Sequence, residues 1–217
     1  MKRREFSRAL GASCLAGGAG LSTLSAQAQG KPESGTDYLP LPKPAPVETP
    51  AGKVEVVEFF WYSCPHCNAF EPSFQQWISR APKDVVVKRV PVAFREDFGP
   101  QQRLYFALEA MGLVEKLHAK VFYAIHVERQ RIDSPAAIIE WVGKQGVDKA
   151  KFTDQFNSFS TAGKLKRALQ LQDAYKVEGV PALGVAGRFY TDATYAKSMD
   201  SALRVVDYLV TEVRKGR

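Results

Sequence analysis

The sequence predicts an α/β fold: a mixed central sheet flanked by helices, with an all-helical segment inserted between its strands. Two dense runs of β-branched and aromatic residues, 53–62 and 85–94, have the composition of buried strands. From about residue 100 to 175, apolar residues instead recur every three or four positions, which is the spacing of amphipathic helices. Structureless connections of that length are rare in compact domains, so the helical block must pack as a layer of its own.

Segments on either side of the helical block complete the predicted sheet. Residues 29–53 hold six of the thirteen prolines, which exclude a helix and predict an extended lead-in, with residues 38–41 pairing at a sheet edge. After the block, the short apolar runs 181–186 and 188–190 flank a turn glycine and predict a β-hairpin. A closing helix is predicted over 199–213, where apolar side chains recur at helical spacing.

These elements divide the chain into four parts. They are a cleaved leader, an extended lead-in, an α/β domain in two pieces and a helical insertion between those pieces, with the ranges 1–28, 29–53, 54–98 with 176–217, and 99–175. Within the insertion, Ser134-Pro135 has the pattern of a helix start, because serine is a favourable N-cap and proline suits the first helical position.

The first 28 residues have the pattern of an export signal. A basic stretch, 1–8, precedes an apolar and glycine-rich stretch, 9–24, and Ala26-Gln27-Ala28 supplies a small-x-small cleavage site. Arg3-Arg4 is typical of a twin-arginine signal but lacks the usual Ser or Thr before the pair, so this route and the Sec route both stay open. Cleavage removes Cys14 and predicts a mature protein in the periplasm, an oxidising compartment.

Composition and charge exclude several classes of protein. At 45% apolar residues the chain is neither disordered nor collagen-like, and past the leader it has no run of 18 apolar residues that could span a membrane. The formal net charge is +7, of which the leader carries +3, so the mature chain is mildly basic at +4. Its lysines and arginines are scattered, which is typical of solvated helix faces and argues against nucleic acid as a partner.

Cys64 and Cys67 form a Cys-x-x-Cys motif directly after a predicted strand. Such a pair at a helix start serves as a redox dithiol, as half of a zinc site or as a haem attachment point. Haem attachment needs a histidine after the second cysteine, where this chain has Asn68. A zinc site needs two more ligands, but there is no second thiol pair and one of the three histidines lies between the cysteines. The motif therefore favours redox chemistry with no metal.

The spacing of the motif favours one thiol over the other. Pro65 suits the first helical position, which makes Cys64 the N-cap and places its sulfur at the positive end of the helix dipole. A thiolate is stabilised there, and a protonated His66 adds to the effect, whereas a disulfide sulfur gains little. Cys67, one turn inside the helix, is predicted to be the buried, resolving thiol. The alternative is a static Cys64–Cys67 disulfide, but so short a loop would stabilise the fold weakly.

Two other stretches accompany the motif. The run Phe59-Phe60-Trp61-Tyr62-Ser63 leads into it with Glu58 in front, and Gly179-Val180-Pro181-Ala182 follows far downstream. With these stretches the sequence resembles the DsbA family of thiol:disulfide oxidoreductases, over essentially the whole mature chain. The resemblance implies a thioredoxin fold with an inserted helical domain, and an enzyme that needs no cofactor beyond its redox-active Cys64–Cys67 disulfide.

The resemblance also implies roles for residues outside the motif. It implies that Val180-Pro181 is a cis peptide packed beside the disulfide, and that the Val180 backbone pairs with an extended substrate segment. It further implies that Glu58 is buried under the active site and accepts the proton of Cys67. For Glu58, a strand carboxylate paired with a lysine is the alternative.

The predicted function is disulfide donation by a monomer to newly exported, unfolded proteins. The resemblance implies that a quinone-linked membrane protein of the DsbB type reoxidises the cysteine pair. A dithiol reductase or isomerase on the same fold is one alternative, although isomerases of this superfamily carry a dimerisation domain and residues 29–53 are too short to be one. A non-catalytic, chaperone-like binding module that uses the groove beside Pro181 is the other.

Overall fold

The computed structural model describes residues 30–216, and its centre is a five-stranded mixed sheet with the strand order β1-β5-β4-β2-β3. Among the described strands, β2 and β3 run parallel, while the other neighbouring pairs are antiparallel. The strands are β1 (Leu39–Pro40), β2 (Val54–Phe60), β3 (Val85–Pro91), β4 (Ala182–Val185) and β5 (Phe189–Asp192).

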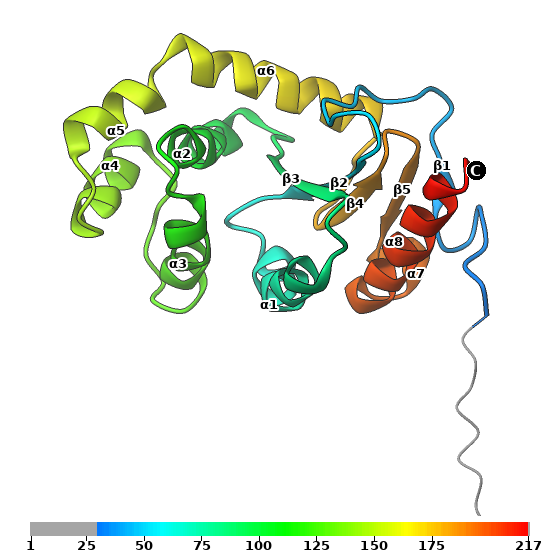
Figure 1. Ribbon diagram of the computed structural model, residues 1–217. Helices are drawn as coiled ribbons and strands as arrows, with labels where there is room; N and C mark the ends of the chain where they lie inside the picture. Colours follow the sequence, from blue (N-terminus) through cyan, green and yellow to red (C-terminus); the bar gives the residue numbers. More distant parts are fainter. Residues whose placement is uncertain (1–29, 217) are drawn as a thin grey trace, which may run out of the picture. The chain divides into compact units, whose positions relative to one another are not determined.

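Helices cover both faces of this sheet. In Figure 1, α1, α7 and α8 lie on one side of the sheet and α6 on the other, while α2–α5 group beside the β3 edge. The helices are α1 (Pro65–Arg80), α2 (Gly99–Ala110), α3 (Val114–His126), α4 (Pro135–Lys144), α5 (Lys149–Phe156), α6 (Phe159–Ala174), α7 (Ala193–Ala196) and α8 (Met199–Arg214), with a 3₁₀ turn η1 (Glu96–Phe98) before α2.

The central strand β2 divides two hydrophobic cores. All seven of its residues are buried, as its dense run of valines and phenylalanines predicts. Because successive side chains of a strand point to opposite faces, Val56 packs with residues of α1 and α8, whereas Val57 and Phe59 pack with residues of the helical insertion. The strand therefore ends between two packed layers, and the residues that follow it are held firmly.

Most predicted elements are present, and the differences have local causes. The lead-in pairs with the sheet edge, since Leu39 lies opposite Tyr190, and Ser134 caps α4 with Pro135 at its first position. The strand predicted to reach residue 94 ends at Pro91 instead. There the Gln172 side chain accepts the Ala93 N–H, which takes the place of a strand partner and lets the chain leave the sheet. The short α7 and η1 were not predicted.

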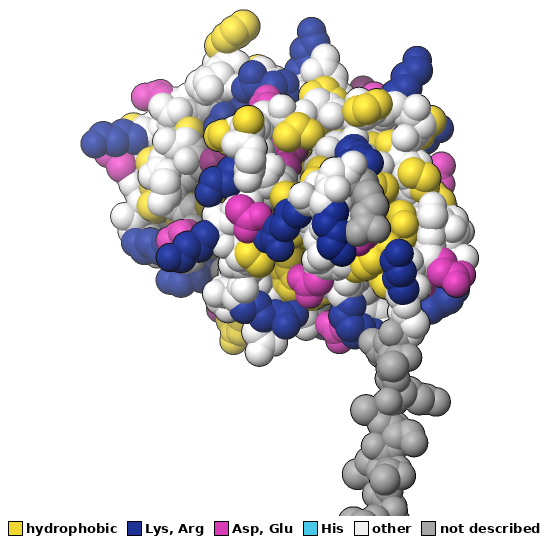
Figure 2. All heavy atoms as spheres, turned by 45° about the vertical axis from the view of Figure 1, so that its right-hand side comes forward, with side chains coloured by type: hydrophobic (Ala, Val, Ile, Leu, Met, Phe, Trp, Pro, Cys, Tyr) yellow, Lys and Arg dark blue, Asp and Glu magenta, His cyan; other side chains and the backbone are white. Residues whose placement is uncertain are grey.

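The surface agrees with the scattered charge of the sequence. On the face shown in Figure 2, lysine and arginine side chains are spread out with acidic and apolar side chains between them. None of the helices in residues 30–216 is both long and apolar enough to cross a membrane. The predicted leader, its cleavage site and Cys14 lie outside the described residues.

Candidate active site

Cys64 lies between the end of β2 and the start of α1. A turn closes over residues 61–64, where the Cys64 N–H donates to the Trp61 carbonyl at 3.0 Å. The backbone then enters α1 with Cys64 as the N-cap and Pro65 at the first helical position, as predicted. Both cysteines are buried free thiols, with Cys64 7% and Cys67 1% exposed, so the structure represents the reduced protein.

The surroundings of Cys64 favour its thiolate. The Cys67 thiol donates to the Cys64 sulfur, and this contact lowers the pKa of Cys64 to about 6 against the opposing effect of burial. The peptide N–H groups of Cys67 and His66 at the helix start, and the His66 ring, act in the same direction. His66 itself is exposed, so its ring can reach solvent and a bound partner.

Cys67 has the opposite character. Burial raises the pKa of Cys67 far above its ordinary range, and the neighbouring Cys64 raises it further. Two thiols that are three residues apart therefore differ strongly in acidity. Such a difference lets one sulfur act as nucleophile and leaving group while the other stays protonated.

The loop before β4 packs against the Cys64 sulfur. The Val180–Pro181 peptide bond is cis, as the resemblance implies, and the Cys64 thiol donates to the Val180 carbonyl at 3.3 Å. The structure thus brings Cys64, Cys67, Pro65, His66, Val180 and Pro181 together at one place, although they come from two distant stretches of the chain.

A hollow of about 510 Å³ opens beside this loop. Its apolar lining includes Phe70, Pro181 and Met199, while Asp192 and Asp200 contribute carboxylates. The groove beside His66 and Pro181 is therefore neither purely apolar nor dominated by charge. The other lining residues are His66, Ala69, Ser73, Gly179, Val180, Ala193, Thr194 and Ser198.

A buried ionic cluster joins β2, β3 and α1. Arg89 Nε lies 2.7 Å from Glu58 Oε2, and Arg89 Nη2 lies 2.9 Å from each carboxylate oxygen of Glu71. Burial raises the pKa of Glu58 to about 7. Arg89 lowers this pKa in part, whereas the negative charge of Glu71 raises it. Glu58 was predicted to be buried near the cysteines and is 1% exposed. Its partner is an arginine, and not the lysine of the alternative interpretation.

The second carboxylate of the cluster stays ionised. Burial alone would raise the pKa of Glu71, but His118, Arg89 and Gln75 together hold it below its ordinary value. Sequence reasoning missed Glu71 and Arg89. A signal was available for Glu71, which shares the buried face of α1 with Cys67, Phe70 and Phe74, because a carboxylate among apolar residues at helical spacing must find a buried partner.

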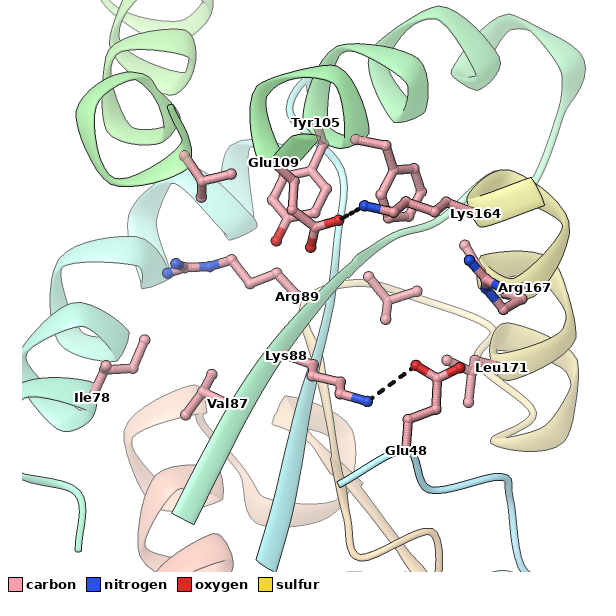
Figure 3. Close-up of a pocket in the computed structure, with 14 residues that line it drawn as sticks. Glu48, Ile78, Val87, Lys88, Arg89, Tyr105, Glu109, Lys164, Arg167 and Leu171 are labelled. Atoms are coloured by element: carbon pink, nitrogen blue, oxygen red, sulfur yellow. Dashed lines mark hydrogen bonds and ion pairs between the residues drawn. The ribbon is translucent and has the colours of Figure 1, made fainter. Parts of the chain in front are cut away.

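A second hollow lies beside β3, and Arg89 of the cluster is one of the residues that line it (Figure 3). Arg89 points toward α1, whereas Lys88 points the other way toward Glu48. The hollow, of about 380 Å³, lies against α2 and α6, where Lys164 pairs with Glu109. None of the cysteine, histidine or cis-proline residues of the redox motif lines it.

The donor set does not suggest a metal centre. Within residues 30–216 there is no group of three or more His, Cys, Asp or Glu side chains that could hold a metal ion.

Comparisons with known proteins agree with this geometry. A family model described as "DSBA-like thioredoxin domain" matches residues 100–204. The thiol:disulfide interchange protein DsbA of Bordetella pertussis is 44% identical over 216 residues, 99% of this chain and all of that protein. The corresponding protein of Pseudomonas aeruginosa is 39% identical over 181 residues, 83% of this chain and 85% of that one.

Solved structures show the same architecture. The crystal structure of Pseudomonas aeruginosa DsbA matches with a TM-score of 0.80 at 38% identity, over 85% of this chain and 95% of that one. The oxidoreductase DsbA of Xylella fastidiosa matches with a TM-score of 0.79 at 31% identity, over 86% of this chain and all of that one. The predicted fold, a thioredoxin fold with inserted helices, is confirmed.

Proposed function

Since this chain belongs to the DsbA family of thiol:disulfide oxidoreductases, we propose that Cys64 and Cys67 are its redox pair and donate their disulfide to unfolded proteins in the periplasm. The observation that carries the proposal is the place of the Cys64 sulfur at the N-cap of α1, where the Cys67 thiol and the N–H groups of Cys67 and His66 lower its pKa to about 6. Ionisation stabilises the reduced form and leaves the disulfide unaffected. The disulfide is therefore a strong oxidant.

The proposed reaction has two exchange steps. A substrate thiolate attacks the Cys64 sulfur, the Cys64–Cys67 bond breaks, and its electron pair goes to Cys67. A second substrate thiolate then attacks the substrate sulfur of the mixed disulfide and expels Cys64 as a thiolate. The substrate loses two electrons and gains a disulfide, while the cysteine pair gains both electrons.

Glu58 is the proposed proton donor and acceptor for Cys67. The buried Cys67 sulfur must take up a proton when the disulfide opens, because its thiolate is strongly disfavoured. Glu58 is buried with a pKa of about 7, so near neutral pH it can both give and receive a proton. On the substrate side, the Val180 backbone and Pro181 would hold an extended segment against Cys64, which lies 3.3 Å from the Val180 carbonyl.

Export and reoxidation complete the proposal. The leader pattern of residues 1–28 supports delivery to the periplasm, by either of the two routes. A quinone-linked membrane protein of the DsbB type would then restore the disulfide, acting at the groove beside Pro181. A monomer suffices for each of these steps.

The reduction potential tests the proposed direction of transfer. Equilibration with glutathione should give a value well above that of thioredoxin, about −270 mV. A value close to thioredoxin's would instead assign the protein to dithiol reduction, for which the same fold is equally suited.

A Cys64→Ser variant tests whether the protein acts as an enzyme at all. The variant should fail to restore disulfide-dependent motility in a strain that lacks its own donor, because the first exchange step needs the sulfur. Restored motility would contradict the enzymatic role and favour a chaperone-like binding module.

A further inference from the structure

The turn that precedes α1 and carries Cys64 is held by side chains of α2 and α3. In this turn, which spans residues 61–64, the Cys64 N–H bonds to the Trp61 carbonyl and the two central residues are Tyr62 and Ser63. The backbone angles of these central residues set where the Cys64 sulfur lies relative to the first N–H groups of α1. Contacts that fix them therefore act on the reactive sulfur without touching it.

Three ring-bearing side chains on one face of α3 contact the hydroxyl, the ring and the backbone carbonyl of Tyr62. His118, Phe122 and His126 are spaced by four residues, so they lie on one face of the helix, one turn apart. His118 Nδ1 lies 2.9 Å from the Tyr62 hydroxyl, and the Phe122 ring packs edge-on against the Tyr62 ring at 5.1 Å. His126 Nε2 donates to the Tyr62 carbonyl at 2.8 Å.

A side chain of α2 holds the next residue of the turn. Gln101 Nε2 donates to the Ser63 hydroxyl at 2.8 Å and also to the Ile132 carbonyl at 2.8 Å. Ile132 belongs to the segment between α3 and α4. The Gln101 amide therefore bonds both to the insertion itself and to the turn. Trp61, the first residue of the turn, stacks on Phe98 at 3.9 Å with an angle of 12° between the rings.

We propose that Gln101, His118 and His126 are positioning residues, through which the helical insertion holds Tyr62 and Ser63 and so keeps Cys64 aligned with the start of α1. This inference rests on the proposed role of Cys64. It assigns the insertion a task in the redox chemistry beyond covering the sheet. If these positions served packing alone, apolar side chains would fill them at a lower free-energy cost, because a buried polar group must find a hydrogen-bond partner.

The test compares variants that differ in one donor. His126→Leu removes the N–H that reaches the Tyr62 carbonyl, whereas His126→Gln keeps an N–H donor at a similar distance. Lys120→Leu is the matched control, since Lys120 is an exposed residue of the same helix. Each variant is measured for the pH dependence of Cys64 alkylation, the equilibrium with glutathione and the unfolding temperature.

The expected result separates positioning from stability. His126→Leu should move the alkylation midpoint upward by about 0.7 pH unit and lower the equilibrium constant for glutathione oxidation about fivefold, the effect of one hydrogen bond. His126→Gln should bring the alkylation midpoint and the equilibrium constant most of the way back to the parent values, and Lys120→Leu should leave both unchanged. A lower unfolding temperature with unchanged midpoint and equilibrium constant would overturn the inference.

A second arm keeps the test decisive if His126→Leu does not fold. Tyr62→Phe removes only the hydroxyl that meets His118, so it should shift the same two quantities in the same direction. An unchanged Tyr62→Phe protein would overturn the role of His118. If the parent protein itself alkylates like a free cysteine, the proposed function fails instead, and that outcome is seen before any variant is made.

Discussion

At the scale of single residues, the site depends on the opposite environments of Cys64 and Cys67. Their order in the motif and the place of Pro65 predict the N-cap and the buried partner, because helix capping is a local property. The lining of the groove could not be predicted in this way. Asp192, at the end of β5, and Asp200, in the first turn of α8, reach it from the C-terminal part of the chain, and only the packing of these elements brings them there.

The first prediction concerns the pH dependence of stability. Cys64 has a lowered pKa of about 6 in the folded, reduced protein against 9.0 as its ordinary value. Between these pH values it is ionised when folded but not when unfolded, so the free energy of unfolding of the reduced form rises with pH across this window. The disulfide cannot ionise there. Urea unfolding should show that the free energy of unfolding rises more steeply from pH 6 to 9 for the reduced form than for the oxidised form. The same pH dependence for both forms would contradict the lowered pKa of Cys64.

A second prediction concerns Glu58. If it exchanges a proton with Cys67, Glu58→Gln should slow disulfide exchange with a cysteine peptide and remove the inflection near pH 7, because the raised pKa of that carboxyl is about 7. Stopped-flow exchange rates over pH 5 to 9 provide the measurement. Glu115→Gln, an exposed carboxylate of α3, is the control. An inflection that persists in Glu58→Gln would exclude Glu58 as the titrating group.

At the scale of elements, buried charge ties the layers together. Arg89 of β3 bonds to Glu58 of β2 and to Glu71 of α1, so three elements share one guanidinium. The strands and α1 are predictable from composition and periodicity. The cluster is not, because its members are far apart in the sequence and their pairing depends on the parallel register that sets Glu58 beside Arg89.

A third prediction follows for Arg89. Arg89→Ala leaves two buried carboxylates without their cation, and loss of one partner of a buried ion pair costs about 3–5 kcal/mol. The free energy of unfolding from urea titration should fall accordingly. Arg131→Ala is the control: Arg131 is exposed and pairs with Asp133 two residues away, so its removal should leave the unfolding midpoint almost unchanged. Equal effects of the two substitutions would contradict the structural role of the cluster.

At the scale of the whole molecule, the insertion packs tightly against the sheet. The side chain of Tyr175, just after α6, packs over Gly184 of β4, and a Cβ added at Gly184 would overlap the Tyr175 ring. The Tyr175 hydroxyl also accepts the Gly187 N–H at 2.9 Å. Sequence periodicity predicts that a helical layer covers the sheet, but not where it meets the sheet, since that depends on side chains from both.

The fourth prediction uses two glycines of opposite character. Gly184→Ala should destabilise the protein by about 1–3 kcal/mol, because overpacking forces the Tyr175 ring to shift. Gly163→Ala, within α6 and with open space around its Cβ position, should stabilise it by about 0.5–1 kcal/mol through lower backbone entropy in the unfolded chain. Thermal unfolding of both variants checks the signs. A stabilised Gly184→Ala protein would contradict the close fit.

The pairing of β2 with β4 also bears on how the protein is made. Val56 lies opposite Val185, so β2 gains its second neighbour only after the entire helical insertion has been synthesised. A nascent chain therefore exposes both cysteines well before the strand that completes their surroundings exists. The Val180 carbonyl beside Cys64 and the antiparallel partner of β2 are supplied only when the segment from Val180 onward has been made.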